Sequence, residues 1–282
     1  MVSWKNPDEL SSFKELCSDT HRADLKTLMS GEHSAERVAD YKVAMSSGLS
    51  YCFASKAVDD EILSKLQALA DEAELSAKFR ELYNGAVINT GENRLVLHQL
   101  CRGQLGDPVI ADGVDKHEFY THEQTKIADF SDAVHKGDIV NAKGEHFTTV
   151  VQIGIGGSDL GPRAMYIALE NWAKANDKLR MKAHFISNVD PDDAASVLKS
   201  IDLEHSLFIL VSKSGTTLET LTNEAFVKTA LKAAGLDPAR HMIAVTSETS
   251  PLAKSKDYLA AFFMDDYIGG RYSSSSAVGG AV

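Results

Sequence analysis

From about residue 147 onwards, short apolar runs alternate with stretches of helical length. The strongest apolar run is SLFILVS at residues 206–212, and the strongest helical stretch follows at residues 217–234. Alternation at these lengths predicts a parallel sheet with helices on both faces and right-handed crossovers. We predict strands at residues 147–154, 181–187, 206–212, 241–246 and 261–265, and further helices at residues 160–174, 192–200 and 250–256.

The first hundred residues have a helical pattern instead. Residues 59–83 carry apolar side chains near helical spacing, and Asn84-Gly85 would end that helix with a left-handed cap. A second helix is predicted at residues 92–102. Residues 103–115 are rich in Gly, Asp and Pro, so we place a boundary there. It separates a helical N-terminal region, residues 1–109, from an α/β domain, residues 110–282.

The charge balance argues against capture of polyanions. Lys and Arg number 29 and Asp and Glu 40, a net charge of −11 at pH 7. Nucleic acid and anionic membranes are therefore not expected partners, and an anionic ligand would need local N–H groups, hydroxyls and a few cations. No apolar run approaches the roughly 18–20 residues of a membrane span, and the first residues lack a signal-peptide core.

The cysteines indicate a reducing compartment. Cys17, Cys52 and Cys101 are widely spaced and odd in number, so they cannot all pair within one chain. We expect reduced thiols and a cytoplasmic location.

Ligands of such sheets bind beyond the carboxyl ends of the strands, so the loops there carry the candidate chemistry. The first loop reads GIGGSDLGP at residues 154–162. Its glycines let backbone approach a ligand, and the following helix offers unpaired N–H groups. Asp159 breaks the dinucleotide fingerprint, and Pro162 replaces the lysine of a nucleotide phosphate loop. A glycine-rich turn without a ligand is the alternative.

Residues 212–217, SKSGTT, form what we call the hydroxyl loop, with four hydroxyl groups between a buried strand and a long helix. Hydroxyls and helix N–H groups can bind a phosphate without net positive charge. Thr216 and Glu219 also have capping-box spacing. Capping would explain one hydroxyl, but not Ser212, Ser214 and Thr217 together.

Residues 269–272, GGRY, form what we call the arginine turn. The two glycines place the guanidinium of Arg271 against closely packed backbone, where it could stabilise an oxyanion or a phosphate. A solvated arginine in a surface turn is the alternative. Arg94 and His98 are four residues apart and would share one face of the helix predicted at residues 92–102.

No metal site is predicted. His117 and His122, in the run HEFYTH, are five residues apart rather than the four that place two ligands on one helix face. Asp190, Asp192 and Asp193 lack the spacing of a calcium loop and stand at a helix start, where carboxylates are favourable.

These motifs together resemble the glucose-6-phosphate isomerase family. GIGGSDLGP at residues 154–162, SKSGTTLETLTN at 212–223 and GGRYSSSSAVG at 269–279 occur in the family's order, and residues 88–102 resemble its N-terminal motif. Gly91 and Ser274-Ser275 are local departures. The family fold has two doubly wound sugar-isomerase (SIS) domains. The resemblance implies that residues 110–282 form the first, five-stranded and flavodoxin-like, and that the second is absent from this chain.

The resemblance also implies an activity, the interconversion of glucose 6-phosphate and fructose 6-phosphate through a cis-enediol, without metal or organic cofactor. By matching position, Ser212, Ser214 and Thr217 hold the phosphate beside the backbone N–H of Lys213. Gly157 and Ser158 contact the sugar, and Arg271 stabilises the enediolate.

Family members are considerably longer, and the missing half holds the glutamate base, the histidine linked to ring opening and a late lysine. We therefore expect an N-terminal fragment that binds phosphate weakly and catalyses little, whereas the full-length form would be a homodimer with its site built across subunits. The alternative is a non-catalytic phosphosugar-binding SIS module.

Overall fold

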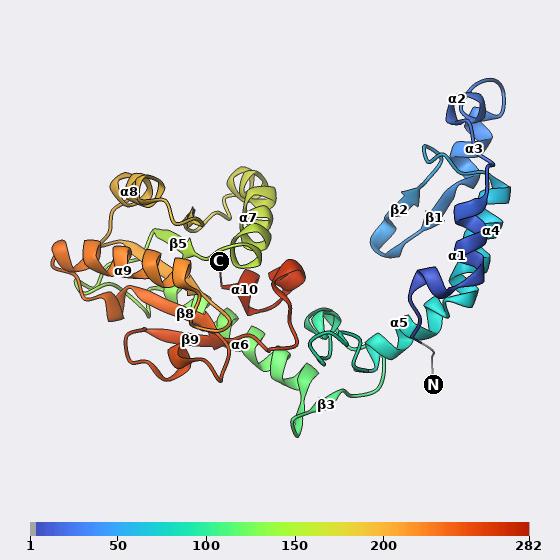
Figure 1. Ribbon diagram of the computed structural model, residues 1–282. Coiled ribbons are helices and arrows are strands. Elements are labelled where there is room, and N and C mark those ends of the chain that lie inside the picture. Colours follow the sequence, from blue (N-terminus) through green and yellow to red (C-terminus); the bar gives the residue numbers. More distant parts are fainter. Residues whose placement is uncertain (1–3, 282) are drawn as a thin grey trace. The chain divides into compact units, whose positions relative to one another are not determined.

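The structure, a computed structural model, describes residues 4–281. The chain divides after Glu81 into two compact units: unit 1 up to Glu81 and unit 2 from Leu82 (Figure 1). Within residues 4–281, no helix is both long and apolar enough to cross a membrane.

Unit 1 consists of helices and one small hairpin. Its elements are α1 (Ser11–Ser18), α2 (Leu25–Leu28), α3 (Ser34–Asp40), the antiparallel pair β1 (Lys42–Ala44) and β2 (Ser50–Cys52), α4 (Asp60–Glu72) and the larger part of α5 (Leu75–Tyr83). The single helix predicted at residues 59–83 is wrong. Glu74 adopts a left-handed conformation, with φ of 52°, and separates α4 from α5. The hairpin is also missing from the sequence prediction.

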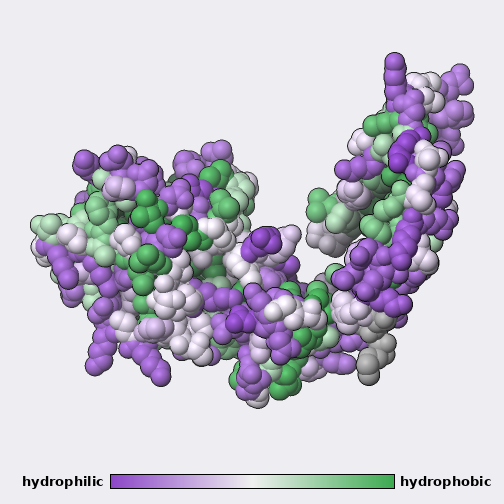
Figure 2. Space-filling model, viewed as in Figure 1, coloured by the Kyte–Doolittle hydropathy of each residue, from purple (hydrophilic) through white to green (hydrophobic). Residues whose placement is uncertain are grey.

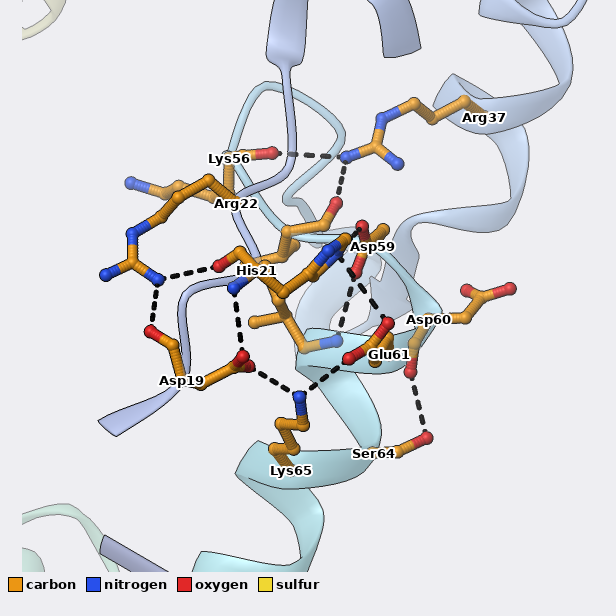
Figure 3. A network of polar contacts seen from close by, with 12 residues as sticks. Asp19, His21, Arg22, Arg37, Lys56, Asp59, Asp60, Glu61, Ser64 and Lys65 are labelled. Carbon is orange, nitrogen blue, oxygen red and sulfur yellow. Dashed lines mark hydrogen bonds and ion pairs between the residues drawn. The ribbon is translucent and has the colours of Figure 1, made fainter. Parts of the chain in front are cut away.

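Polar contacts hold much of unit 1 together. The guanidinium of Arg37, on α3, is buried and donates hydrogen bonds to the carbonyl oxygens of Ala54, Lys56 and Val58. Figure 3 shows it near a second network, which includes His21 and Asp59. A buried guanidinium is tolerated here because backbone oxygens satisfy its donors.

Unit 2 contains the predicted parallel sheet. Its strands are β5 (Thr149–Ile153), β6 (Lys182–Ile186), β7 (Ser206–Val211), β8 (Met242–Thr246) and β9 (Ala260–Phe263), within two residues of the predicted bounds. They lie in the order β6-β5-β7-β8-β9, and every neighbouring pair is parallel. The doubly wound, five-stranded fold is thereby confirmed.

Helices cover both faces of this sheet (Figure 1). They are α6 (Lys116–Lys136), α7 (Gly157–Ala175), α8 (Pro191–Ser200), α9 (Leu218–Ala233) and α10 (Ala277–Gly280). Alternate residues of β7 point to opposite faces, as the strand period requires. Leu207 and Ile209 pack in one apolar core with Ile127 of α6, whereas Phe208 packs in the other with Val227 of α9.

The longest helix, α6, is missing from the sequence prediction. Asp115 caps its first turn by accepting hydrogen bonds from the backbone N–H groups of His117 and Glu118, and Gly137 ends it with φ of 82°. A small antiparallel hairpin precedes α6. Its two strands, β3 (Ile110–Ala111) and β4 (Val114–Asp115), have two residues each. Lys116 and Glu123 are buried on α6, which obscures the apolar period that would mark the helix.

Residues 92–102 do not form the predicted α-helix. Asn89 and Arg94 pair across a tight turn, and only a short 3-10 helix follows at His98–Arg102. Leu97, Leu100 and Val109 pack in one apolar cluster with Tyr120 and Ile268. This cluster belongs to unit 2, which begins at Leu82, so the boundary predicted at residue 109 falls inside that unit.

Candidate functional site

The strand order places two of the predicted loops at a switch point. The chain leaves β5 for β6 on one side and later enters β7 on the other side of β5. Crossovers therefore diverge between β5 and β7, where the carboxyl ends of adjacent strands leave a crevice. The loop after β5 begins at Gly154, and the hydroxyl loop begins at Ser212 directly after β7.

Gly157, in the loop after β5, is required by close packing against the arginine turn. A Cβ on Gly157 would lie 2.1 Å from the carbonyl oxygen of Gly270, closer than backbone atoms can approach. The hydroxyl of Ser273 donates to the Gly270 carbonyl at 2.8 Å. Gly156 caps α7 with φ of 58° and ψ of −119°, a conformation open to glycine. The start of α7 and the arginine turn are thus one packed unit.

Ser158 occupies the first turn of α7 and is half-buried. Its carbonyl accepts a hydrogen bond from Gln152 Nε2 at 2.5 Å. Gln152 lies on β5 and is 1 % exposed, so the sheet fixes the backbone that carries this predicted sugar contact.

The hydroxyls of the hydroxyl loop contact one another. Ser212 Oγ lies 3.4 Å from Thr217 Oγ1, and the hydroxyl of Thr216 donates to Ser214 Oγ at 2.9 Å. Ser212 is buried, and Ser214 is exposed. Gly215 has φ of 66°, and a Cβ there would meet Ser250 Oγ at 2.1 Å. The loop is therefore tightly turned, and its hydroxyl groups lie close to one another.

The capping box that the spacing of Thr216 and Glu219 would allow is not formed. The residue that caps α9 is Thr217, and its side chain makes no capping hydrogen bond. The first backbone N–H groups of α9 therefore donate no hydrogen bond to the side chain of the N-cap residue. Such free N–H groups at the start of a helix attract anions.

Neighbouring segments hold the backbone of the hydroxyl loop. Thr246 Oγ1, at the end of β8, donates to the Ser212 carbonyl at 2.7 Å. The N–H of Ser247 donates to the Lys213 carbonyl at 3.0 Å. The Lys213 ammonium donates in turn to the carbonyls of Asp266 and Ile268, both at 3.2 Å. Lys213 therefore joins the hydroxyl loop to the segment that precedes the arginine turn.

Arg271 is exposed, and its guanidinium makes no hydrogen bond or ion pair within the part of the chain that the structure describes. It lines a cavity of about 230 Å³ together with Arg94, His98 and Lys213. Glu92 and Asp266 supply the carboxylates of the same cavity. An arginine without an internal partner can bind an incoming anion without first breaking an ion pair.

Arg94 and His98 do not share a helix face, because the helix there begins only at His98. Both nevertheless line the cavity beside Arg271. His98 Nε2 lies 2.8 Å from the carbonyl oxygen of Gly269, in the arginine turn. Since a carbonyl only accepts, Nε2 carries the proton.

The structure thus brings several of the predicted residues together. Lys213 and Arg271 line one cavity, Gly157 packs against the arginine turn, and Ser212 lies next to Thr217. The Lys213 side chain is the contribution that sequence reasoning missed. No local pattern could have indicated it, since its partners lie more than fifty residues further along the chain.

Titratable clusters elsewhere are not arranged for a metal. Within residues 4–281, no group of three or more His, Cys, Asp or Glu side chains could hold an ion. His117 Nδ1 lies 3.1 Å from the Leu100 carbonyl, a contact with backbone. Cys17, Cys52 and Cys101 are free thiols, and burial raises the pKa of Cys101 to about 12.

The fold and the two loops define a class, the flavodoxin-like doubly wound α/β proteins with a candidate anion site at the switch point. The sequence model of the phosphoglucose isomerase family matches residues 52–282, and the chain belongs to that family.

Relatives agree with this assignment. The chain is 57% identical to a glucose-6-phosphate isomerase of Treponema denticola over 100% of this chain and 54% of the relative. It is 53% identical to that of Treponema pallidum (strain Nichols), over 100% and 53%. The crystal structure of a glucose-6-phosphate isomerase from Chlamydia trachomatis superposes with a TM-score of 0.84 at 36% identity, over 98% of this chain and 52% of the other. The chain spans about half the length of these relatives.

Proposed function

We propose that this chain supplies the phosphate-binding and enediolate-stabilising part of an isomerase for glucose 6-phosphate and fructose 6-phosphate. The observation that carries the proposal is the cavity shared by Arg271 and Lys213. It joins an unpaired guanidinium to the hydroxyl loop. A phosphosugar needs both features, since its phosphate and its reacting carbons lie at opposite ends.

The phosphate would be bound by neutral groups. Ser212, Ser214 and Thr217 offer hydroxyls, and the N–H of Lys213 and the start of α9 add backbone donors. These groups bind an anion by direct hydrogen bonds and the helix dipole, without a field of positive charge. That suits a chain with a net charge of −11.

The reaction would transfer a proton between C1 and C2 after ring opening. Removal of the C2 proton of glucose 6-phosphate generates an enediolate, and return of a proton to C1 gives fructose 6-phosphate. Arg271 would stabilise the negative charge on the enediolate oxygen. Gly157 and Ser158, beside the arginine turn, would contact the sugar. The base would come from the region of the family that this chain does not span.

A binding experiment tests the phosphate site. Isothermal titration of the chain with fructose 6-phosphate is expected to show weak binding, whereas fructose should not bind. Thr217→Ala should weaken binding about tenfold, the equivalent of one hydrogen bond to a charged group. Lys254→Met, an exposed control outside the loop, should not change it. Equal binding of fructose and fructose 6-phosphate would contradict the proposal.

A coupled assay tests the position of the base. Starting from fructose 6-phosphate, we expect no measurable glucose 6-phosphate from the chain alone, because base catalysis contributes about 10²–10⁴-fold. Turnover would instead place a base in this chain. Glu92→Gln and Asp266→Asn would then identify it, since these carboxylates share the Arg271 cavity.

We further propose a cytoplasmic location, supported by three free thiols, which a reducing compartment maintains. A homodimeric full-length enzyme is proposed from the family resemblance.

A further inference from the structure

Four consecutive carbonyl groups lead into the arginine turn, and each accepts a hydrogen bond from another segment. The Lys213 ammonium donates to the carbonyls of residues 266 and 268, both at 3.2 Å. The backbone N–H of Leu97 donates to residue 267 at 3.1 Å. His98 Nε2 donates to residue 269 at 2.8 Å. Two of these three donors are side chains whose removal leaves the backbone intact.

The Lys213 ammonium bonds to backbone carbonyl groups rather than to a charged side chain. No carboxylate lies within ion-pair distance of its ammonium among the described residues, so backbone oxygens are its partners. Its own carbonyl accepts the N–H of Ser247, which fixes its backbone in the hydroxyl loop. An ammonium has three donors and no acceptor, and it can bind two carbonyls at once.

We propose that Lys213 and His98 are positioning residues for Arg271, and that Lys213 transmits anion binding at the hydroxyl loop to the arginine turn. The coupling, though not the anchoring, rests on the proposed function. Arg271 follows two adjacent glycines, which alone would leave its backbone free to vary. An anion that orders the hydroxyl loop also orders the Lys213 backbone, and through its ammonium the carbonyls of residues 266 and 268. Binding energy at the phosphate would thereby place the guanidinium at the reacting carbons.

The anchoring is tested without any ligand, by amide hydrogen exchange. The N–H groups of Tyr267 and Ile268 are hydrogen-bonded to Asp265, so their exchange reports on opening of this segment. In Lys213→Met they should exchange about tenfold faster, since two bonds to a charged donor are lost. Lys213→Arg should restore slow exchange, and Lys254→Met, an exposed lysine of unit 2, should have no effect. Unchanged exchange in Lys213→Met would overturn the anchoring.

His98 provides an independent test of the same anchor. His98→Gln keeps a donor near the Gly269 carbonyl, whereas His98→Phe keeps a ring and removes the donor. Exchange at Ile268 should accelerate in His98→Phe and remain close to wild type in His98→Gln. Acceleration in His98→Gln but not in His98→Phe would show that the ring packing against Tyr272, and not the hydrogen bond, is what matters.

The coupling is tested by adding fructose 6-phosphate. In the wild-type chain, saturation should slow exchange at Tyr267 and Ile268 severalfold. In Lys213→Met the ligand should still bind through the hydroxyls, but without slowing exchange there. Slowing of equal size in both proteins would overturn the coupling. Absence of binding to the wild-type chain would overturn the proposed function and the coupling together, whereas the ligand-free comparison decides the anchoring by itself.

Discussion

At the scale of single residues, the candidate site contains a close approach between two glycines. Gly157, at the start of α7, and Gly270, in the arginine turn, meet backbone to backbone. Neither partner is a flexible side chain that could move aside. The position of Arg271 therefore depends on the absence of a side chain at residue 157.

Gly157→Ala should destabilise unit 2 by roughly 1–3 kcal/mol or more, because overpacking forces backbone to shift. Its new Cβ would lie 2.1 Å from the Gly270 carbonyl oxygen. Gly91→Ala is the matched control, since a Cβ there would meet only Asn89 Oδ1, at 3.7 Å. Urea unfolding measures both, and a shift of similar size in the two variants would contradict the packing argument.

A second residue-scale prediction concerns pH and unit 1. His21 Nε2 lies 2.6 Å from Asp59 Oδ2, and this hydrogen bond raises the pKa of His21 (Figure 3). A raised histidine pKa means that folding favours the protonated form. The resulting stabilisation is complete below the ordinary pKa of about 6.5 and is lost as pH rises through the raised value.

His21→Gln should therefore lower the stability of unit 1 at about pH 5.5 more than at about pH 8.5. His33→Gln is the control, because His33 pairs with Glu36 at the surface, where its side chain is 89% exposed and contributes little. Thermal unfolding at the two pH values measures the difference. An effect of His21→Gln that does not depend on pH would contradict the stabilising role of the protonated His21.

At the scale of elements, the starts of α6 and α9 differ in whether a side chain caps the helix. The Asp115 carboxylate accepts hydrogen bonds from two backbone N–H groups at the start of α6. The Thr217 side chain makes no capping hydrogen bond at the start of α9. A threonine at an N-cap position ordinarily contributes to stability. Here its hydroxyl turns toward Ser212 instead.

Asp115→Ala should cost about 0.5–2 kcal/mol of unfolding free energy. Thr217→Ala should change it by less than about 0.5 kcal/mol, while it weakens binding of fructose 6-phosphate. Denaturation and titration of the same two variants measure both effects. A loss of stability in Thr217→Ala as large as in Asp115→Ala would mean that Thr217 has a structural role.

Element prediction from the sequence succeeded where the pattern was local. The five strands have continuous apolar runs, and α9 has strong helical spacing. In these segments the tertiary packing favours the same secondary structure as the local sequence. Residues 92–102 have a helical pattern too, but the backbone N–H of Leu97 bonds to the Tyr267 carbonyl instead of continuing a helix. For α6, buried Lys116 pairs with Asp265 at 3.0 Å, a partner that the local sequence does not contain.

At the scale of the whole molecule, the two units differ in how much apolar surface they bury. Among the described residues of unit 1, the buried apolar side chains are Leu10 and Ala54, whereas both faces of the sheet in unit 2 have extensive cores. Apolar burial is the main stabilising contribution to folding. Amide hydrogens of α4 should therefore exchange faster than those of β7, and limited proteolysis should cut first within unit 1. Equal protection in both would contradict this.

Unit 2 also presents apolar side chains to solvent along α7. Leu160, Ile167, Leu169 and Trp172 are each more than half exposed, and apolar surface is visible near α7 (Figure 2). Exposed apolar stretches of this kind promote association. Light scattering should therefore show self-association that rises with concentration. Leu169→Lys should reduce it, and Asn171→Lys, which adds the same charge at an exposed polar position, should not.

The sequence by itself determined the parallel sheet, the order along the chain of its strands and of α7, α8 and α9 between them, and the three loops that carry the candidate chemistry. Those features follow from local apolar periods and from glycine, hydroxyl and arginine residues close together in the chain. The tertiary structure alone decided that Gly157 meets Gly270, that the Thr217 side chain does not cap its helix, and that Lys213 and His98 bond to the carbonyls of residues 266, 268 and 269. Each of these depends on contacts between segments far apart in sequence, which form only when the strands of the sheet bring the loops together.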